Sequence, residues 1–318
     1  MREARFEIPV FNETLEVSRF IGEAGVDGGN TVLFIGGVHG NETAGIGALN
    51  KVFTELNSGK YEFAGKAIAI IGNLEATRLS QRYLYKDMNR IWTRELIDDL
   101  HYERLDTRHT EYAELKEVYD ILQDIIANTT GKLFVVDLHT TSSPTIPFIV
   151  TNNLDQSIRF TRSFPMPVIS GLTGFLDGTL LSYVNDLGHT GLAYEAGQHY
   201  SSQSLVKHES FVWLSLHSTG VCTSISGPEI RRHHDVLQEE LVTRTNYFKL
   251  ISRYKIREGE EFKMNPGYAN FQKIYAGEEL ATNQDGPITS PYDGYIFMPL
   301  YQSLGDDGFF IVKPDADI

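Results

Sequence analysis

The chain has 318 residues, of which 41% are hydrophobic and 22% are charged, a composition typical of a globular protein with a full α/β core. Its formal net charge of −14 at pH 7 repels nucleic acid and anionic membrane surfaces, so we expect neither as a partner. The single cysteine, Cys222, leaves no thiolate pair, and any metal must therefore be held by histidines and carboxylates. An N-terminal segment broken by charges, with no long apolar stretch after it, predicts a cytoplasmic protein without a membrane span.

Short apolar runs, the pattern of buried parallel strands, recur through the first half of the chain. They cover residues 31–38, 66–73, 133–138 and 146–151. Between and after them, apolar side chains recur at intervals of three and four, as in helices. These helical segments span residues 42–56, 112–126 and 204–220. The alternation predicts an α/β fold with a mostly parallel, mixed sheet that is covered by helices on both faces.

The character of the sequence changes after about Cys222. A polar helix from 227 to about 240 precedes short segments that Gly and Pro interrupt, which predicts a small β domain. We therefore expect an α/β domain that carries the chemistry, residues 1–225, and a β-rich C-terminal domain, residues 226–318.

Three potential metal ligands stand where strands are predicted to end. His39 and Glu42 close the first apolar run in the string HGNE, and His139 follows the run 133–138 in the string DLHTT. Because the carboxyl ends of parallel strands meet at one edge, these donors can converge on a zinc ion and leave a fourth position for water. Asp137 is a candidate partner for an imidazole. The alternatives are a surface histidine beside a helix-start glutamate, and a hydrogen-bonded core histidine.

Glu195 ends a further strand-like segment, GLAYE. A carboxylate beside a metal-bound water can take its proton and later pass it to a leaving nitrogen. A strand-end salt bridge is the alternative.

The segment QRYLYKDMNRIW, residues 81–92, concentrates cations and an amide in an otherwise acidic protein. Arg82 is suited to a carbonyl oxygen as it becomes an oxyanion, and Asn89 beside Arg90 is suited to a carboxylate. A solvated, charged helix face fits the same composition.

Together these motifs resemble those of the succinylglutamate desuccinylase/aspartoacylase family, which is related to zinc carboxypeptidases. The strings HGNETAG, NLEATRLSQRYLYKDMNRIW, DLHTT and YEAG carry the similarity, in the family's order, over roughly residues 30–220. The resemblance implies a zinc-carboxypeptidase-like fold, one Zn²⁺ per chain and a small N-acyl substrate.

The resemblance also implies roles in the reaction. His39, Glu42 and His139 match the family's zinc ligands. Glu195 matches the glutamate that activates the zinc-bound water, and Arg82 matches the arginine that helps polarise the scissile carbonyl.

Substrate contacts are implied in the same way. Asn89 and Arg90 match the pair that binds the substrate's carboxylate, and Tyr301 is the best candidate for a tyrosine that reaches the site from the C-terminal domain. The family's desuccinylase and aspartoacylase carry a further substrate-binding arginine ten positions before the catalytic glutamate, and here that position is Asn185. The loss of a bidentate cation argues against N-acetylaspartate and succinylglutamate as substrates.

We therefore expect a zinc-dependent hydrolase that cleaves the amide bond of an N-acyl amino acid or similar small N-acyl amine, by glutamate-assisted attack of zinc-bound water. One alternative is a metallocarboxypeptidase acting on short peptides, because Asn89 and Arg90 can also clamp a peptide's terminal carboxylate. Another is a non-catalytic zinc-containing binding protein. The sequence is compatible with a homo-oligomer. It does not define the acyl group or the amine of the substrate.

Overall fold

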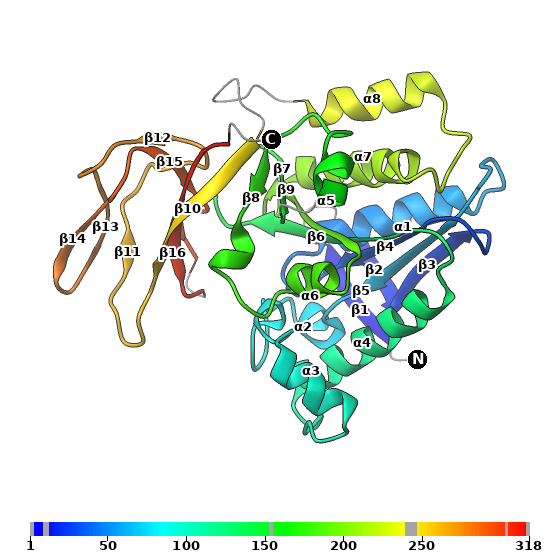
Figure 1. Cartoon of the computed structure of the whole chain (residues 1–318), viewed down its shortest axis with the longest axis horizontal. Helices are drawn as coiled ribbons and strands as arrows, with labels where there is room; N and C mark the ends of the chain where they lie inside the picture. Colours follow the sequence, from blue (N-terminus) through cyan, green and yellow to red (C-terminus); the bar gives the residue numbers. More distant parts are fainter. Residues whose placement is uncertain (1–2, 9–12, 153–154, 239–246, 303–304, 316–318) are drawn as a thin grey trace.

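The computed structural model of the chain describes residues 3–8, 13–152, 155–238, 247–302 and 305–315. Across them runs a mixed eleven-stranded sheet in the order β12-β15-β16-β10-β8-β7-β9-β6-β4-β5-β3 (Figure 1). Its parallel centre consists of β5 (Lys66–Ile71), β4 (Thr31–Gly36), β6 (Leu133–Thr141) and β9 (Thr190–Gln198). Two flanking strands, β3 (Phe20–Gly25) and β7 (Phe148–Thr151), run antiparallel to β5 and β9. The predicted mostly parallel, mixed sheet is confirmed.

Helices cover both faces of this sheet (Figure 1). One face is covered by α1 (Ala44–Leu56), α5 (Asp155–Thr161) and α7 (Ser202–Ser218), with α8 (Gly227–Leu237) outside α7. The other is covered by α3 (Arg94–His101), α4 (Thr110–Asn128) and α6 (Leu180–Asp186). Short elements lie at the ends of strands: α2 (Leu74–Arg78), η1 (Met88–Arg90) and η2 (Leu172–Gly174). A hairpin, β1 (Glu3–Ile8) and β2 (Glu13–Ser18), precedes the sheet.

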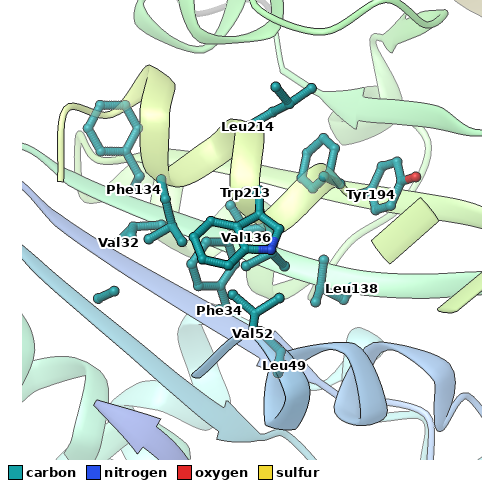
Figure 2. Close-up of a cluster of buried hydrophobic side chains, with 14 of the residues drawn as sticks. Val32, Phe34, Leu49, Val52, Phe134, Val136, Leu138, Tyr194, Trp213 and Leu214 are labelled. Carbon is teal, nitrogen blue, oxygen red and sulfur yellow. The ribbon is translucent and has the colours of Figure 1, made fainter. Parts of the chain in front are cut away.

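The strands read as continuous apolar runs because both faces are packed. In β4, Phe34 packs on the α1 and α7 side, where Val52 and Trp213 lie close by (Figure 2), while Leu33 and Ile35 pack on the α4 side. Each fully buried side chain of this size contributes roughly 1.5–3 kcal/mol through the hydrophobic effect. This core fixes the strand ends that carry the site.

Some boundaries at these strand ends differ from those predicted. β4 ends at Gly36, because Gly37 has a positive φ of 67° and turns the chain out of the sheet. Conversely, β6 continues to Thr141, so His139 lies within the strand. Glu42 does not open the following helix, which starts at residue 44. The predicted end of the polar helix near residue 240 lies outside the described residues.

The C-terminal region is rich in strands, as expected, and it extends the main sheet. β10 (Tyr247–Lys255) pairs in parallel with β8 (Val168–Ser170). Beyond β10 follow β16 (Asp307–Pro314), β15 (Gly294–Phe297) and β12 (Lys273–Ile274). A separate three-stranded sheet contains β11 (Lys263–Met264), β13 (Glu279–Asn283) and β14 (Gly286–Thr289). The division of the chain at residues 225/226 stays a prediction. Within the described residues, every helix is too short or too polar to cross a membrane.

Candidate metal centre and active site

The imidazoles of His39 and His139 face the two oxygens of one carboxylate. Nδ1 of His39 lies 2.9 Å from Oε1 of Glu42, and Nδ1 of His139 lies 3.1 Å from Oε2. All three residues are buried, and one ligand atom from each lies within 4.8 Å of the others. Two imidazole nitrogens and a carboxylate oxygen form a ligand set typical of zinc. The structure therefore brings the three predicted ligands together in an arrangement that could hold a metal ion.

The sheet and a tight turn create this convergence. β4 and β6 are parallel neighbours, so the residues that follow β4 lie at the same edge as the end of β6. In the turn, Gly40 packs directly on the backbone of α2, since a Cβ there would lie 2.1 Å from the carbonyl carbon of Ala76. The backbone N–H of Thr140 donates to Oε2 of Glu42 at 2.9 Å. The turn that carries His39 and Glu42, called the ligand loop below, is thus held against α2 on one side and against β6 on the other.

An aspartate supports each imidazole from behind. Nε2 of His39 lies 3.3 Å from Oδ1 of Asp87, and Nε2 of His139 lies 2.6 Å from Oδ2 of Asp137. A carboxylate at Nε2 keeps the proton on that nitrogen and leaves the Nδ1 lone pair for a metal. The contact expected for Asp137 is present. The contact between Asp87 and an imidazole was not predicted.

The electrostatics of the centre favour a cation. Burial alone would raise the pKa of Glu42, but His39 and His139 hold it well below its usual range. Burial alone would lower the pKa of His139, but Asp137 and Glu42 raise it well above its usual range. A buried group that holds a proton so strongly lies in a negative potential, which would also stabilise a metal ion.

Glu195 lies beside this centre with one oxygen free. It is opposite His139 in the β6–β9 register, and its side chain is buried. Oε2 has no hydrogen-bond partner among the described residues. Burial raises the pKa of Glu195 to about 7, although the nearby His139 lowers it. A buried carboxylate with such a pKa and a free oxygen is suited to act as a general base on a water molecule.

The segment 81–92 forms a loop with a single 3-10 turn rather than a helix face, and it closes over the centre. Arg82 donates from Nη1 to Glu42 at 3.4 Å and from Nη2 to Asp87 at 3.2 Å. Asn89 donates from Nδ2 to Asp137 at 3.2 Å. Both side chains therefore contact the groups that orient the predicted ligands.

Arg90 forms an ion pair with a residue from the far end of the chain. Its Nη2 donates to Oδ2 of Asp307, at the start of β16, at 2.8 Å, and Nε of Arg253 donates to the other oxygen of Asp307. The adjacent Asn89 accepts the backbone N–H of Leu180 at 3.1 Å. These contacts hold the segment between α6 and the C-terminal strands.

A cavity of about 140 Å³ opens beside the predicted ligands and catalytic groups. Arg82, Asn89, Arg90 and Glu195 all line it. The lining of the cavity also includes residues that were not predicted: Thr140, Leu181, His199, Met298, Asp307 and Phe310. Nδ1 of His199 lies 2.7 Å from the hydroxyl of Thr140. Two of these residues stand close to a sequence signal, Thr140 in the string DLHTT and His199 four positions after Glu195.

Comparison with known proteins identifies the family. Residues 28–210, more than half of the chain, match the model of the succinylglutamate desuccinylase/aspartoacylase catalytic domain. The chain belongs to this family. A succinylglutamate desuccinylase from Serratia proteamaculans is 32% identical over 109 residues, which are 34% of this chain and 31% of that protein. The similarity in sequence thus spans about a third of the relative's length.

Solved structures support the family fold over nearly the whole chain. The succinylglutamate desuccinylase from Vibrio cholerae has a TM-score of 0.69 at 18% identity, covering 99% of this chain and 91% of that one. A succinylglutamate desuccinylase/aspartoacylase from Rhodobacter sphaeroides has a TM-score of 0.65 at 18% identity, covering 99% and 95%. At this identity the likeness concerns the fold.

Two positions assigned by the family resemblance lie away from the cavity. The hydroxyl of Tyr301 donates to the carbonyl of Asn265 at 2.8 Å, the residue is 41% exposed, and it does not line the cavity. Asn185 is buried in α6, where its Oδ1 accepts the N–H of Gly191 at 2.9 Å. The part of α6 that does line the cavity contributes Leu181. Leu181, rather than Asn185, is therefore the side chain by which this helix reaches the cavity.

Proposed function

We propose that this member of the succinylglutamate desuccinylase/aspartoacylase family is a zinc-dependent hydrolase of the amide bond in an N-acyl amino acid or similar small N-acyl amine. One ion per chain would be held by His39, Glu42 and His139. The observation that carries the proposal is the convergence of two Nδ1 atoms and a carboxylate beside the free, buried oxygen of Glu195.

The donor set fits a zinc ion on chemical grounds. The ligands are two imidazoles and one carboxylate, they are buried, and each imidazole is supported by an aspartate at Nε2. Three protein ligands leave a coordination position open, as in catalytic zinc sites. When bound there, zinc would lower the pKa of a water molecule and polarise the carbonyl oxygen of the substrate.

Glu195 supplies the proton transfers in this proposal. As a base, it takes the proton of the attacking water, and as an acid, it returns that proton to the leaving nitrogen. Its raised pKa of about 7 is compatible with both directions at neutral pH. Such general acid–base catalysis accounts for roughly a hundredfold to ten-thousandfold in rate.

We assign to the loop 81–92 the binding of the developing oxyanion and of the substrate's carboxylate. Arg82 would stabilise the oxyanion that develops on the carbonyl oxygen, and Asn89 with Arg90 would bind the carboxylate of the substrate. Nε of Arg82 and Nε of Arg90 are buried and have no hydrogen-bond partner among the described residues.

Removal and return of the metal test the proposal. The protein is treated with a chelator, its metal content is measured, and release of free amine from a panel of N-acyl amino acids is followed before and after zinc is added back. We expect activity to disappear with the metal and to return with zinc. Full activity in metal-free protein would contradict the proposal. Short peptides in the same panel test the carboxypeptidase alternative, which requires that they be cleaved faster.

A further inference from the structure

The sheet face beside Glu195 changes from polar to apolar across one strand. On one side of β9, His139 lies opposite Glu195. On the other side, β7 places Phe148 opposite Glu195 and Val150 opposite Ala193. Residues that lie opposite each other in a sheet project from the same face. Glu195 therefore stands between a predicted metal ligand and an apolar surface.

Other elements continue this apolar surface into a wall of the cavity. The wall consists of Val150, Leu172, Leu176, Leu181, Met298 and Phe310. All six belong to one packed cluster or lie against it, together with Phe148. Because the wall is part of a packed core, the shape of the cavity is fixed before any ligand binds.

The charges in the cavity leave no free cation on this wall. Among the described lining residues, the cations are Arg82 and Arg90, and each is ion-paired, Arg82 to Asp87 and Arg90 to Asp307. Carboxyl groups also line the cavity: Asp87, Asp137, Glu195, Asp306 and Asp307, the last two of which also pair with Arg253. A second carboxylate on the substrate would be buried here without a counter-charge.

The position of Glu195 determines which part of the substrate meets this wall. If Glu195 returns a proton to the leaving nitrogen, that nitrogen must lie within hydrogen-bond reach of its carboxylate. The carbonyl oxygen then lies toward the metal ligands and Arg82. We place the substituents of the nitrogen on the opposite side, where Ala193 and Val150 line the cavity together with Arg90.

We propose that the amine released by this enzyme is an amino acid with an uncharged, apolar side chain. The inference rests on the proposed function and defines its substrate class. The apolar wall of the cavity suits side chains such as those of leucine, methionine and phenylalanine. Each methylene group buried against the wall should raise kcat/KM by about fourfold.

Two substrates of nearly equal shape test the inference. The side chains of N-acetyl-leucine and N-acetylaspartate branch in the same way, and only the second carries a charge. We expect kcat/KM with zinc-loaded protein to be at least tenfold higher for N-acetyl-leucine, and to rise along the series alanine, 2-aminobutyrate, norvaline. Equal or higher activity on N-acetylaspartate would overturn the inference while leaving a zinc deacylase in place.

Binding of the product amino acids gives a second readout that needs no turnover. Calorimetric titration of zinc-loaded protein with leucine and with aspartate should show tighter binding of leucine, even if no N-acyl substrate is cleaved. That result would support the apolar site although the proposed reaction fails. Binding of aspartate as tightly as leucine, or no binding of leucine, would overturn the inference.

The ion pair between Arg90 and Asp307 provides a variant that should change the preference. Asp307→Asn keeps the shape of the side chain and removes the charge that neutralises Arg90. We expect the ratio of kcat/KM for N-acetyl-leucine over N-acetylaspartate to fall at least tenfold. Asp186→Asn makes the same change at an exposed residue outside the cavity and should leave the ratio unchanged. If Asp307 has only a structural role, both activities fall together and the ratio stays the same, which would overturn the inference.

Discussion

The carboxylate of Asp137 lies 2.6 Å from Nε2 of His139, and both side chains are almost completely buried. The two residues stand on the same face of β6, two positions apart. The same strand thus carries a proposed metal ligand and the carboxylate that orients it. A carboxylate in this position increases the basicity of the imidazole and fixes its rotation.

Replacing Asp137 should therefore weaken metal binding while the ligands stay in place. We expect Asp137→Asn to lower the affinity for zinc by roughly 10–100-fold, measured by competition with a chelator of known affinity. Asp177→Asn, at an exposed residue outside the cavity, serves as the control and should bind zinc like the parent protein. Unchanged affinity in Asp137→Asn would show that the contact does not support a ligand.

Glu195→Gln should separate metal binding from catalysis. The amide has the same shape as the carboxylate but cannot accept a proton from water, so we expect kcat to fall by roughly a hundredfold to ten-thousandfold. Zinc affinity should change little, since Glu195 is outside the proposed ligand set. Glu95→Gln, on the exposed side of α3, is the matched control. Near-normal turnover in Glu195→Gln would remove this residue from the proposed mechanism.

The residues at strand ends could be predicted because their signal is local. A buried parallel strand reads as an apolar run, and polar groups at its carboxyl end are visible in the sequence itself. This pattern is how His39, Glu42, His139 and Glu195 were predicted as site residues, and the structure brings them together at one edge of the sheet. The ion pair between Arg90 and Asp307 spans 217 positions, and no local pattern indicates which distant carboxylate a cation will meet.

Two positions assigned by counting along the chain do not line the cavity, and the role predicted for Tyr301 stays a prediction. Asn185 lies ten residues before Glu195, but it stands in the last turn of α6, where it caps the start of β9. Leu181 is four residues earlier, about 6 Å along the helix axis, and it lines the cavity instead. Likewise, Tyr301 is directed to the backbone of Asn265, whereas its neighbours in the chain line the cavity. A shift of a few residues in a loop or short helix changes which side chain reaches a site.

Gly40→Ala should destabilise the protein through the ligand loop. A Cβ at this position would lie 2.1 Å from the backbone of Ala76 and 2.3 Å from that of Thr77, so α2 or the loop must move. We expect the free energy of unfolding to fall by about 1–3 kcal/mol in urea titrations, together with weaker zinc binding. Gly174→Ala, where an added Cβ meets nothing within 4 Å, is the control. Equal stability of the two variants would contradict the packing argument.

The stability of the protein should fall in mild acid because of His233. This side chain is buried where α8 packs on α7, stacked on Trp213 with ring centroids 6.0 Å apart. Burial lowers the pKa of His233 to about 4, whereas an exposed histidine in the unfolded chain titrates near 6.5. The unfolded chain therefore binds the proton first, and the stability contributed by the neutral imidazole is present above about pH 6.5 and is lost as the pH falls toward 4. The loss should amount to roughly 1–3 kcal/mol.

His233→Gln removes the titrating group, so urea titrations at pH 7 and pH 4.5 should give a smaller difference in unfolding free energy for the variant. The same change at His217→Gln, in the last turn of α7 and exposed, should leave the difference as it is in the parent protein. An unaltered pH dependence in His233→Gln would mean that this histidine is protonated in the folded protein as readily as in the unfolded chain.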